Sequence, residues 1–175
     1  RPRFDQRIRN EIQIVATVLS FDGENDPDIP ALIGASLALM ISGIPFSGPV
    51  AGARVGEIDG ELILNPNYEQ RTRSPFDLVV AGMDEKINML EFEGNEIPEE
   101  KVLKAIEFGH AEYKKLIEFQ NGIAGEFKPE KRKPEIFEPP GKIIGAIKDF
   151  LKDKLEKALY ETGGKAETRE ALAAL

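Results

Sequence analysis

Four arginines open this sequence: RPRFDQRIRNEIQ contains Arg1, Arg3, Arg7 and Arg9 within its first nine residues. A guanidinium group can hold a phosphate through two parallel hydrogen bonds, which the lysine ammonium cannot reproduce. Such a cluster predicts binding of nucleic acid or another phosphate ligand. The alternative is a solvated basic turn without a ligand. The cluster stands out because the chain as a whole carries a formal net charge of -8.

Few other residues offer chemistry of this kind. The chain has no cysteine, which excludes disulfides and thiolate metal sites. His110 is its one histidine, and it falls between Ile106 and Tyr113 on the apolar side of a predicted helix. A single histidine supplies neither a catalytic triad nor a set of metal ligands. We expect His110 to pack with one satisfied hydrogen bond.

Composition indicates a soluble globular protein. The 175 residues are 41% apolar and 31% charged, enough for one core, or for one core and a helical appendage. No apolar run reaches the length of a membrane span, and no export signal opens the sequence. The first residue is Arg instead of Met, so we expect a piece of a longer, cytoplasmic protein that does not bind membranes.

Several short segments predict strands. Residues 10–20, NEIQIVATVLS, are apolar on both alternating faces, which is typical of a central strand covered on both sides. Asp59 and Gly60 lie between two apolar runs and predict a tight hairpin. Residues 77–82 and 87–93 predict two further strands joined by a turn.

Helical periodicity surrounds these strands. Apolar residues encircle 28–42 and predict a buried helix, with Asp26 as a possible cap and Pro27 at its first position. Residues 98–120 predict an amphipathic surface helix, and 142–160 and 166–175 predict two more helices. A segment rich in Gly and Pro separates them, with a basic run at Lys128, Lys131, Arg132 and Lys133 that we interpret as a solvated tether. The predicted fold class is α/β (α+β): a mixed sheet with packed helices, followed by a small all-helical domain.

Specific motifs connect this pattern to a known family. NDPDIPALIGASLALMISGIPFSGPVAGARVG at 25–56, LNP at 64–66, DLVVAG at 77–82 and AIEFGH at 105–110 closely resemble the first of the two RNase PH-like domains of bacterial polynucleotide phosphorylases. The resemblance starts at RPRFDQRIRNEIQ and fades after about residue 121. It implies that residues 1–121 are that domain without its N-terminal strands. Residues 122–175 would be a linker and a truncated helical connector domain.

The resemblance also implies an activity. Polynucleotide phosphorylases, or polyribonucleotide nucleotidyltransferases, are phosphorolytic exoribonucleases that degrade single-stranded RNA from its 3′ end. They use inorganic phosphate, release nucleoside diphosphates and work as homotrimers around an RNA channel. Their Mg²⁺ is bound by the second RNase PH-like domain, which is absent here. We therefore expect RNA as a partner, and no cofactor of this chain's own.

The resemblance predicts that this domain is not catalytic. The strand equivalent to DLVVAG in the family's catalytic domain carries an Asp, a second Asp six residues earlier and a Lys two residues later. Here Asp77 keeps the first position, but Arg71 and Val79 stand at the other two. One carboxylate without converging oxygen ligands is a poor site for a divalent cation. We expect no catalytic and no metal-binding residue here, and a structural role for Asp77 with an arginine or a backbone N–H as its partner.

RNA binding remains the expected role of the first residues. Arg1 with Pro2 matches an arginine-proline pair of the family that leads toward the RNA channel, so Arg1 is the first candidate contact, and Arg3 the second, although the family supports it less. The domain would then serve as trimer scaffold and RNA guide. The alternative is a stand-alone structural or oligomerisation module without RNA binding.

Overall fold

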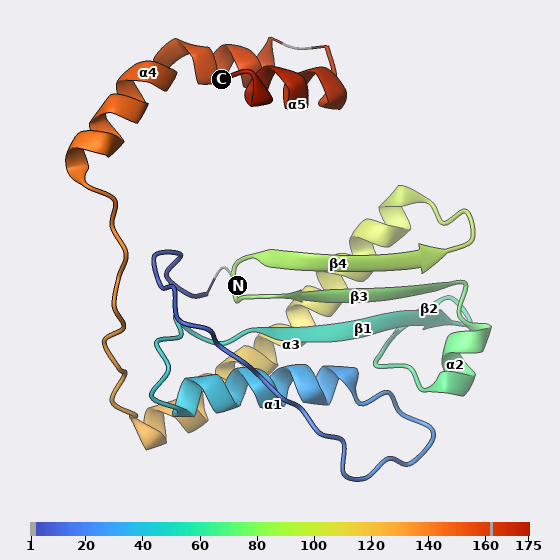
Figure 1. Ribbon diagram of the computed structural model, residues 1–175. Helices are drawn as coiled ribbons and strands as arrows, with labels where there is room; N and C mark the ends of the chain where they lie inside the picture. The colour runs from blue at the N-terminus through green and yellow to red at the C-terminus, as the bar shows by residue number, and fades with distance from the viewer. Residues whose placement is uncertain (1–2, 162) are drawn as a thin grey trace. The chain divides into compact units, whose positions relative to one another are not determined.

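The computed structural model describes residues 3–161 and 163–175 (Figure 1). The chain divides into two compact units, residues 1–135 and residues 136–175, which we describe separately. The first unit combines a sheet with three helices, and the second contains two helices. The α+β fold class with a helical C-terminal part is as predicted.

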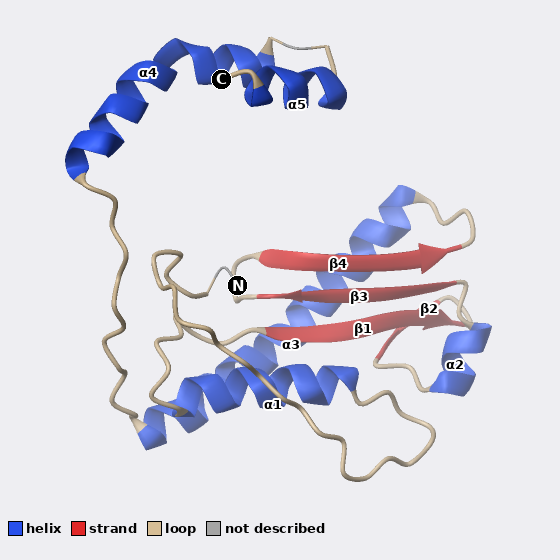
Figure 2. Cartoon of the chain, in the orientation of Figure 1, coloured by secondary structure: helices blue, strands red, loops and turns tan. Residues whose placement is uncertain are grey.

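A four-stranded sheet forms the centre of the first unit (Figure 2). Its order is β2-β1-β3-β4, and all its pairings are antiparallel. The predicted hairpin joins the first two strands, with Asp59 and Gly60 at φ 52° and 85°, the positive values that a tight primed turn requires. The two strands expected near 77–82 and 87–93 are also present. The strand bounds are β1 Ala51–Ile58, β2 Glu61–Leu64, β3 Phe76–Gly82 and β4 Ile87–Gly94.

The long helix α3, Glu99–Phe127, covers one face of this sheet. It ends at Phe127, beyond the predicted end near residue 120. Gly109 lets the helix approach closely, because a Cβ there would lie 2.4 Å from Val80 Cγ1. The core consists of α3 residues and the strand residues beneath them: Ala51, Ala53, Val55, Phe76, Leu78, Val80, Ala105, Tyr113 and Ile117.

Helix α1, Asp28–Ile41, packs against β1 and α3. Its bounds match the prediction, but only Ile29, Ser36 and Leu39 are buried, so the expectation of a fully buried helix was wrong. An apolar circumference does not bury a helix that has neighbours on one side alone.

Side chains complete the hydrogen bonding of β1 where β2 does not reach it. The backbone N–H of Val50 donates to Ser36 Oγ at 2.9 Å, and Gln120 Nε2 donates to the Val50 carbonyl at 3.1 Å. Further along, Arg54 N donates to Asn65 Oδ1 at 3.0 Å, and Asn65 N donates to the Arg54 carbonyl at 2.7 Å.

The central strand predicted at 10–20 was wrong. Residues 11–20 form neither helix nor strand, and Val15 and Leu19 are 75% and 92% exposed. A strand exists only when its backbone groups pair with a neighbouring strand. The four strands of the described sheet pair with one another, and none of them pairs with this segment.

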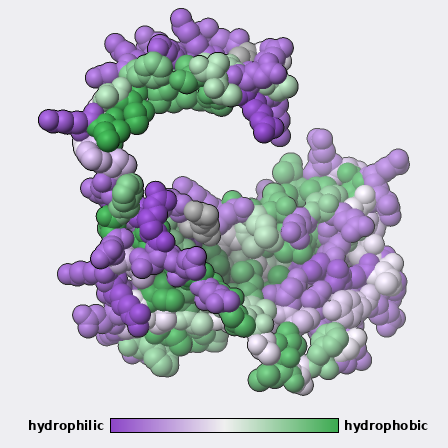
Figure 3. Space-filling model, in the orientation of Figure 1, coloured by the Kyte–Doolittle hydropathy of each residue, from purple (hydrophilic) through white to green (hydrophobic). Residues whose placement is uncertain are grey.

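The second unit consists of α4, Gly141–Tyr160, and α5, Lys165–Ala173. Both helices were predicted, although α4 departs from helical geometry at Lys152. Figure 3 shows apolar side chains along much of α4, and several of them are exposed: Ile143, Ile144, Ile147, Phe150, Leu155 and Leu159. None of the helices in the described ranges has the length and apolar character that a membrane crossing requires.

Candidate functional site

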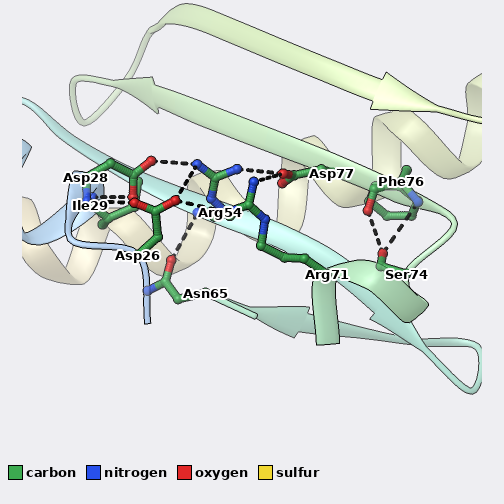
Figure 4. Close-up of polar contacts among 9 residues, drawn as sticks. All are labelled: Asp26, Asp28, Ile29, Arg54, Asn65, Arg71, Ser74, Phe76 and Asp77. Atoms are coloured by element: carbon green, nitrogen blue, oxygen red, sulfur yellow. Dashed lines mark hydrogen bonds and ion pairs between the residues drawn. The ribbon is translucent and has the colours of Figure 1, made fainter. Parts of the chain in front are cut away.

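Asp77 belongs to a cluster of charged side chains on the sheet (Figure 4). Side chains alternate along a strand, so Leu78 and Val80 face the core under α3, and Asp77 and Val79 lie on the opposite face. The neighbouring strand β1 places Arg54 on that same face. The cluster contains one residue of β3, one of β1, one of the short helix α2, Tyr68–Arg73, and two at the start of α1: Asp77, Arg54, Arg71, Asp26 and Asp28.

Two arginines bridge the three carboxylates of this cluster. Arg54 Nη1 lies 2.6 Å from Asp77 Oδ2, and Arg54 Nη2 lies 2.6 Å from Asp28 Oδ2. Arg71 Nη2 contacts the same oxygen of Asp77 at 2.8 Å, while its Nη1 contacts Asp26 Oδ2 at 2.9 Å. These bonds tie β1, β3, α2 and the start of α1 together.

Burial makes the cluster sensitive to the loss of a partner. The Arg54 side chain is only 12% exposed and that of Asp77 only 24%. Burial opposes the charge of Arg54, but the hydrogen bond to Asp28 and the charges of the three aspartates raise the pKa of Arg54. Arg54 Nε and Asp77 Oδ1 are buried without a hydrogen-bond partner among the described residues. Removing one member would leave a poorly solvated charge behind.

This arrangement does not suit a metal ion. The Oδ2 atom of Asp77 already accepts from two guanidinium groups, so a cation there would meet two positive charges. Within residues 3–161 and 163–175, no group of three or more His, Asp or Glu side chains is arranged to hold a metal. We therefore derive no step through Mg²⁺ for these residues. An arginine partner was predicted for Asp77, and two are present.

The sequence interpretation did not find Arg54, Asp26 or Asp28. The sequence does mark Arg54, because it is the single charged residue in the first six residues of AGARVGEI. Its side chain lies on the same face of the sheet as that of Asp77. Asp26 was considered only as a helix cap. Its Oδ1 accepts from the N–H of Asp28, the first residue of α1, at 3.3 Å, and its Oδ2 also accepts from Arg71 Nη1. A separation of 45 residues hides the partnership with Arg71 from the sequence.

Arg3 and Arg7, near the start of the sequence, have separate partners. Arg1 lies outside the described residues. Arg3 donates from Nε to the Gly48 carbonyl at 3.1 Å and from Nη1 to Met83 Sδ at 3.0 Å, and it lines an open cavity of about 440 Å³ together with Lys86. Arg7 forms an exposed ion pair with Asp5 at 2.7 Å.

His110 packs as the sequence predicted. Its Nε2 lies 2.8 Å from the carbonyl oxygen of Asp84, and its ring centroid lies 5.1 Å from that of Tyr113. The Tyr113 hydroxyl donates to the Met83 carbonyl at 3.3 Å. Burial, and secondarily the charge of Asp84, raises the pKa of Tyr113 to about 12. These contacts hold the loop between β3 and β4 against α3.

Comparison with known proteins identifies the part of the chain that contains this cluster. Residues 48–112 match the 3′ exoribonuclease family, domain 2. Those residues belong to that family. They contain Arg54, Arg71 and Asp77, so most of the charged cluster lies inside a domain of the 3′ exoribonuclease family.

Relatives extend the likeness over almost the whole chain. Polyribonucleotide nucleotidyltransferase from Clostridioides difficile is 45% identical over 170 residues, which cover 97% of this chain and 24% of that protein. The same-named protein from Macrococcus caseolyticus is 50% identical over 131 residues, 75% of this chain and 19% of that protein. The aligned part of the chain thus spans about a fifth to a quarter of the length of these relatives.

A solved structure supports the fold. The crystal structure of rice (Oryza sativa) Rrp46 superposes with a TM-score of 0.51 at 20% identity, covering 58% of this chain and 48% of that one. At this identity the likeness concerns the arrangement of helices and strands. The resemblance to the polynucleotide phosphorylase family, inferred from the motifs at 25–56, 77–82 and 105–110, is confirmed.

Proposed function

We propose that this chain is the non-catalytic RNase PH-like domain, with its connector, of a phosphate-dependent 3′-to-5′ exoribonuclease. Residues 1–121 form the domain and residues 122–175 the linker and connector. The parent enzyme degrades single-stranded RNA to nucleoside diphosphates with inorganic phosphate and Mg²⁺. In the cytoplasmic homotrimer, this part acts as scaffold and RNA guide. The relatives' shared name, polyribonucleotide nucleotidyltransferase, supports the parent activity.

The single observation that carries the non-catalytic role is the state of Asp77. Metal-assisted phosphoryl transfer needs carboxylate oxygens directed at a cation. The Asp77 carboxylate is bonded to Arg54 and Arg71, which supply the positive charge that a metal would otherwise bring. Asp77 therefore stabilises the fold and takes no part in transfer chemistry.

The substitution Asp77→Asn in the full-length enzyme tests this role. It keeps the shape of the side chain but removes the charge, so we expect phosphorolysis of poly(A) to stay within about twofold of the parent value. Thermal unfolding should occur at lower temperature, because two arginines lose a charged partner. Loss of turnover in a trimer that remains folded and still binds RNA would contradict the proposal. Arg7→Ala, which removes an exposed ion pair, is the matched control for the loss of a charge.

RNA guidance rests on Arg1 and Arg3. Arg3 and Lys86 line an open cavity that Asp84 and Glu85 also line, and the two cations are the groups there that would contact a phosphate. In the full-length enzyme, Arg1→Ala and Arg3→Ala should each weaken single-stranded RNA binding and reduce the dependence of log Kd on log salt by about one unit. An unchanged salt dependence in both variants would favour the second candidate, a structural module without RNA binding. The exposed apolar side chains of α4 favour that candidate's oligomerising role.

A further inference from the structure

The C-terminus of α1 lacks the usual means of capping. The last turn contains no basic residue, and Ser42 follows it in an extended conformation at φ -87° and ψ 170°. The final carbonyl groups of a helix have no partner within it and carry the negative end of its dipole. The Ser42 hydroxyl donates to one of them, that of Leu39, at 3.0 Å. The end of α1 therefore needs donors from elsewhere in the chain.

Lys131 supplies these donors from a distant part of the sequence. Its Nζ donates to the carbonyl oxygens of Leu39 at 3.0 Å, Met40 at 2.9 Å and Ser42 at 2.8 Å. An ammonium group has three N–H donors, and all three are used here. The positive charge also lies at the negative end of the helix dipole. Lys131 was predicted to belong to a solvated tether, and for this residue that prediction was wrong.

Backbone contacts hold the same stretch of chain. The N–H of Arg132 donates to the Gly43 carbonyl at 2.8 Å. A Cβ on Gly43 would lie 3.4 Å from the Glu130 carbonyl oxygen and 3.5 Å from Arg132 Cγ, so the tether passes close to this glycine. Residues 130–132 thus lie against the end of α1, although no helix or strand includes them.

The neighbouring lysines differ from Lys131 in exposure. Lys128 and Lys133 are exposed, whereas Lys131 is partly buried and burial lowers its pKa. The three carbonyl groups oppose that effect by favouring the ammonium form. A neutral or acylated Nζ would have fewer N–H donors and no charge. The loss of donors and the loss of charge would both weaken the contact between Lys131 and the end of α1.

We propose that Lys131 is a charge-dependent latch that holds the tether on α1, and that acylation of its Nζ opens the latch. In the closed state the backbone N–H of Arg132 is bonded to the Gly43 carbonyl, so this part of the tether is fixed to the end of α1. Opening releases residues 129–132 from the end of α1, while the N–H of Lys128 stays bonded to the Ala124 carbonyl of α3. Four released residues span at most about 14 Å when extended. This inference does not depend on RNA binding or on catalysis.

Hydrogen exchange in the full-length protein with acetyl-lysine placed at position 131 tests the latch. Hydrogen bonds from a charged donor are stronger than neutral ones, so losing the charge should make the Arg132 amide exchange about tenfold faster or more. Acetyl-lysine at 133 is the matched control and should leave that rate unchanged. The variant Lys131→Arg keeps the charge and should retain part of the protection.

The exchange rates of core amides distinguish release of the tether from unfolding of the whole first unit. The amides of Val80 and Ile117 should keep their protection in all variants, because both residues lie in the hydrophobic core. Limited proteolysis should cut between 128 and 135 faster in the 131-acetylated protein only. The proposal is overturned if the Arg132 amide exchanges equally fast with and without acetylation at 131. It is also overturned if acetylation at 133 has the same effect, or if the core amides lose protection in parallel with Arg132.

Discussion

Two segments of this chain have similar compositions and opposite structures. Residues 11–20, EIQIVATVLS, and residues 76–82, FDLVVAG, are both short and rich in Val, Ile and Leu. The second is β3, paired on both sides with β1 and β4, and its Leu78 and Val80 are fully buried. The first has no strand, and its Leu19 is 92% exposed.

The difference shows that β-propensity is a property of the surroundings as much as of the residues. β-branched side chains suit a pleated surface that other groups cover. Residues 76–82 have such cover from α3, whose Gly109 admits the side chain of Val80. Residues 11–20 also contain Val and Leu, but in the described structure they pair with no strand and most of them are exposed.

Hydrogen exchange should give the largest contrast. Amides of β3 open only when the first unit unfolds, so the amides of Leu78 and Val80 should exchange at least about a thousandfold more slowly than those of Val15 and Val18. Exchange followed by mass spectrometry or NMR on the 175-residue chain measures both segments at once. Equal protection in the two segments would mean that residues 11–20 are paired in solution.

Truncating one leucine in each segment should give the next largest contrast. Leu78→Ala removes a fully buried side chain and should lower the free energy of unfolding by about 2–5 kcal/mol. Leu19→Ala is the matched control and should change it by less than about 0.5 kcal/mol. Urea denaturation measures both values. A cost for Leu19→Ala similar to that for Leu78→Ala would contradict the exposure of residues 11–20.

Adding a methyl group between α3 and β3 tests the cover itself. Gly109→Ala places Cβ 2.4 Å from Val80 Cγ1, and overpacking of this kind costs about 1–3 kcal/mol. Gly122→Ala, on the same helix, meets nothing within 4 Å and should stabilise by about 0.5–1 kcal/mol. Thermal unfolding of the two variants shows whether each substitution lowers or raises the stability. A stabilising Gly109→Ala would mean that α3 lies further from β3 than described.

The smallest effect appears only at high pH. Burial raises the pKa of Tyr113 from 10.0 to about 12, so the folded state keeps its proton while the unfolded state loses it. The resulting stability is fully present below pH 10 and is lost as the pH rises to about 12. Its slope should be about 1 kcal/mol per pH unit, and Tyr113→Phe should abolish this part of the pH dependence. If the absorbance of tyrosinate from Tyr113 rose with a midpoint near pH 10, the value of an exposed tyrosine, burial of the hydroxyl would be contradicted.

Much of the fold could be predicted from local signals. The turn residues Asp59 and Gly60, the apolar runs of β3 and β4 and the periodicity of α1 and α3 act within a few residues, so the sequence displays them directly. The charged cluster could not be predicted in the same way. Arg54 meets Asp28 across 26 residues, and Lys131 meets Met40 across 91. Such contacts depend on the packed fold, as does the absence of a partner for residues 11–20.

The side-chain hydrogen bonds around Val50 determine where this sheet can grow. Ser36 and Gln120 occupy the N–H and the carbonyl of Val50, and Asn65 occupies both backbone groups of Arg54. A free strand edge is a template on which another chain can add a strand, and aggregation often begins there. On this side of β1, side chains of α1 and α3 and the turn after β2 already stand in for a neighbouring strand. Any incoming strand is therefore directed to the outer edges of β2 and β4. Replacing Gln120 or Ser36 would expose backbone groups of Val50 on which a strand of a second molecule could pair.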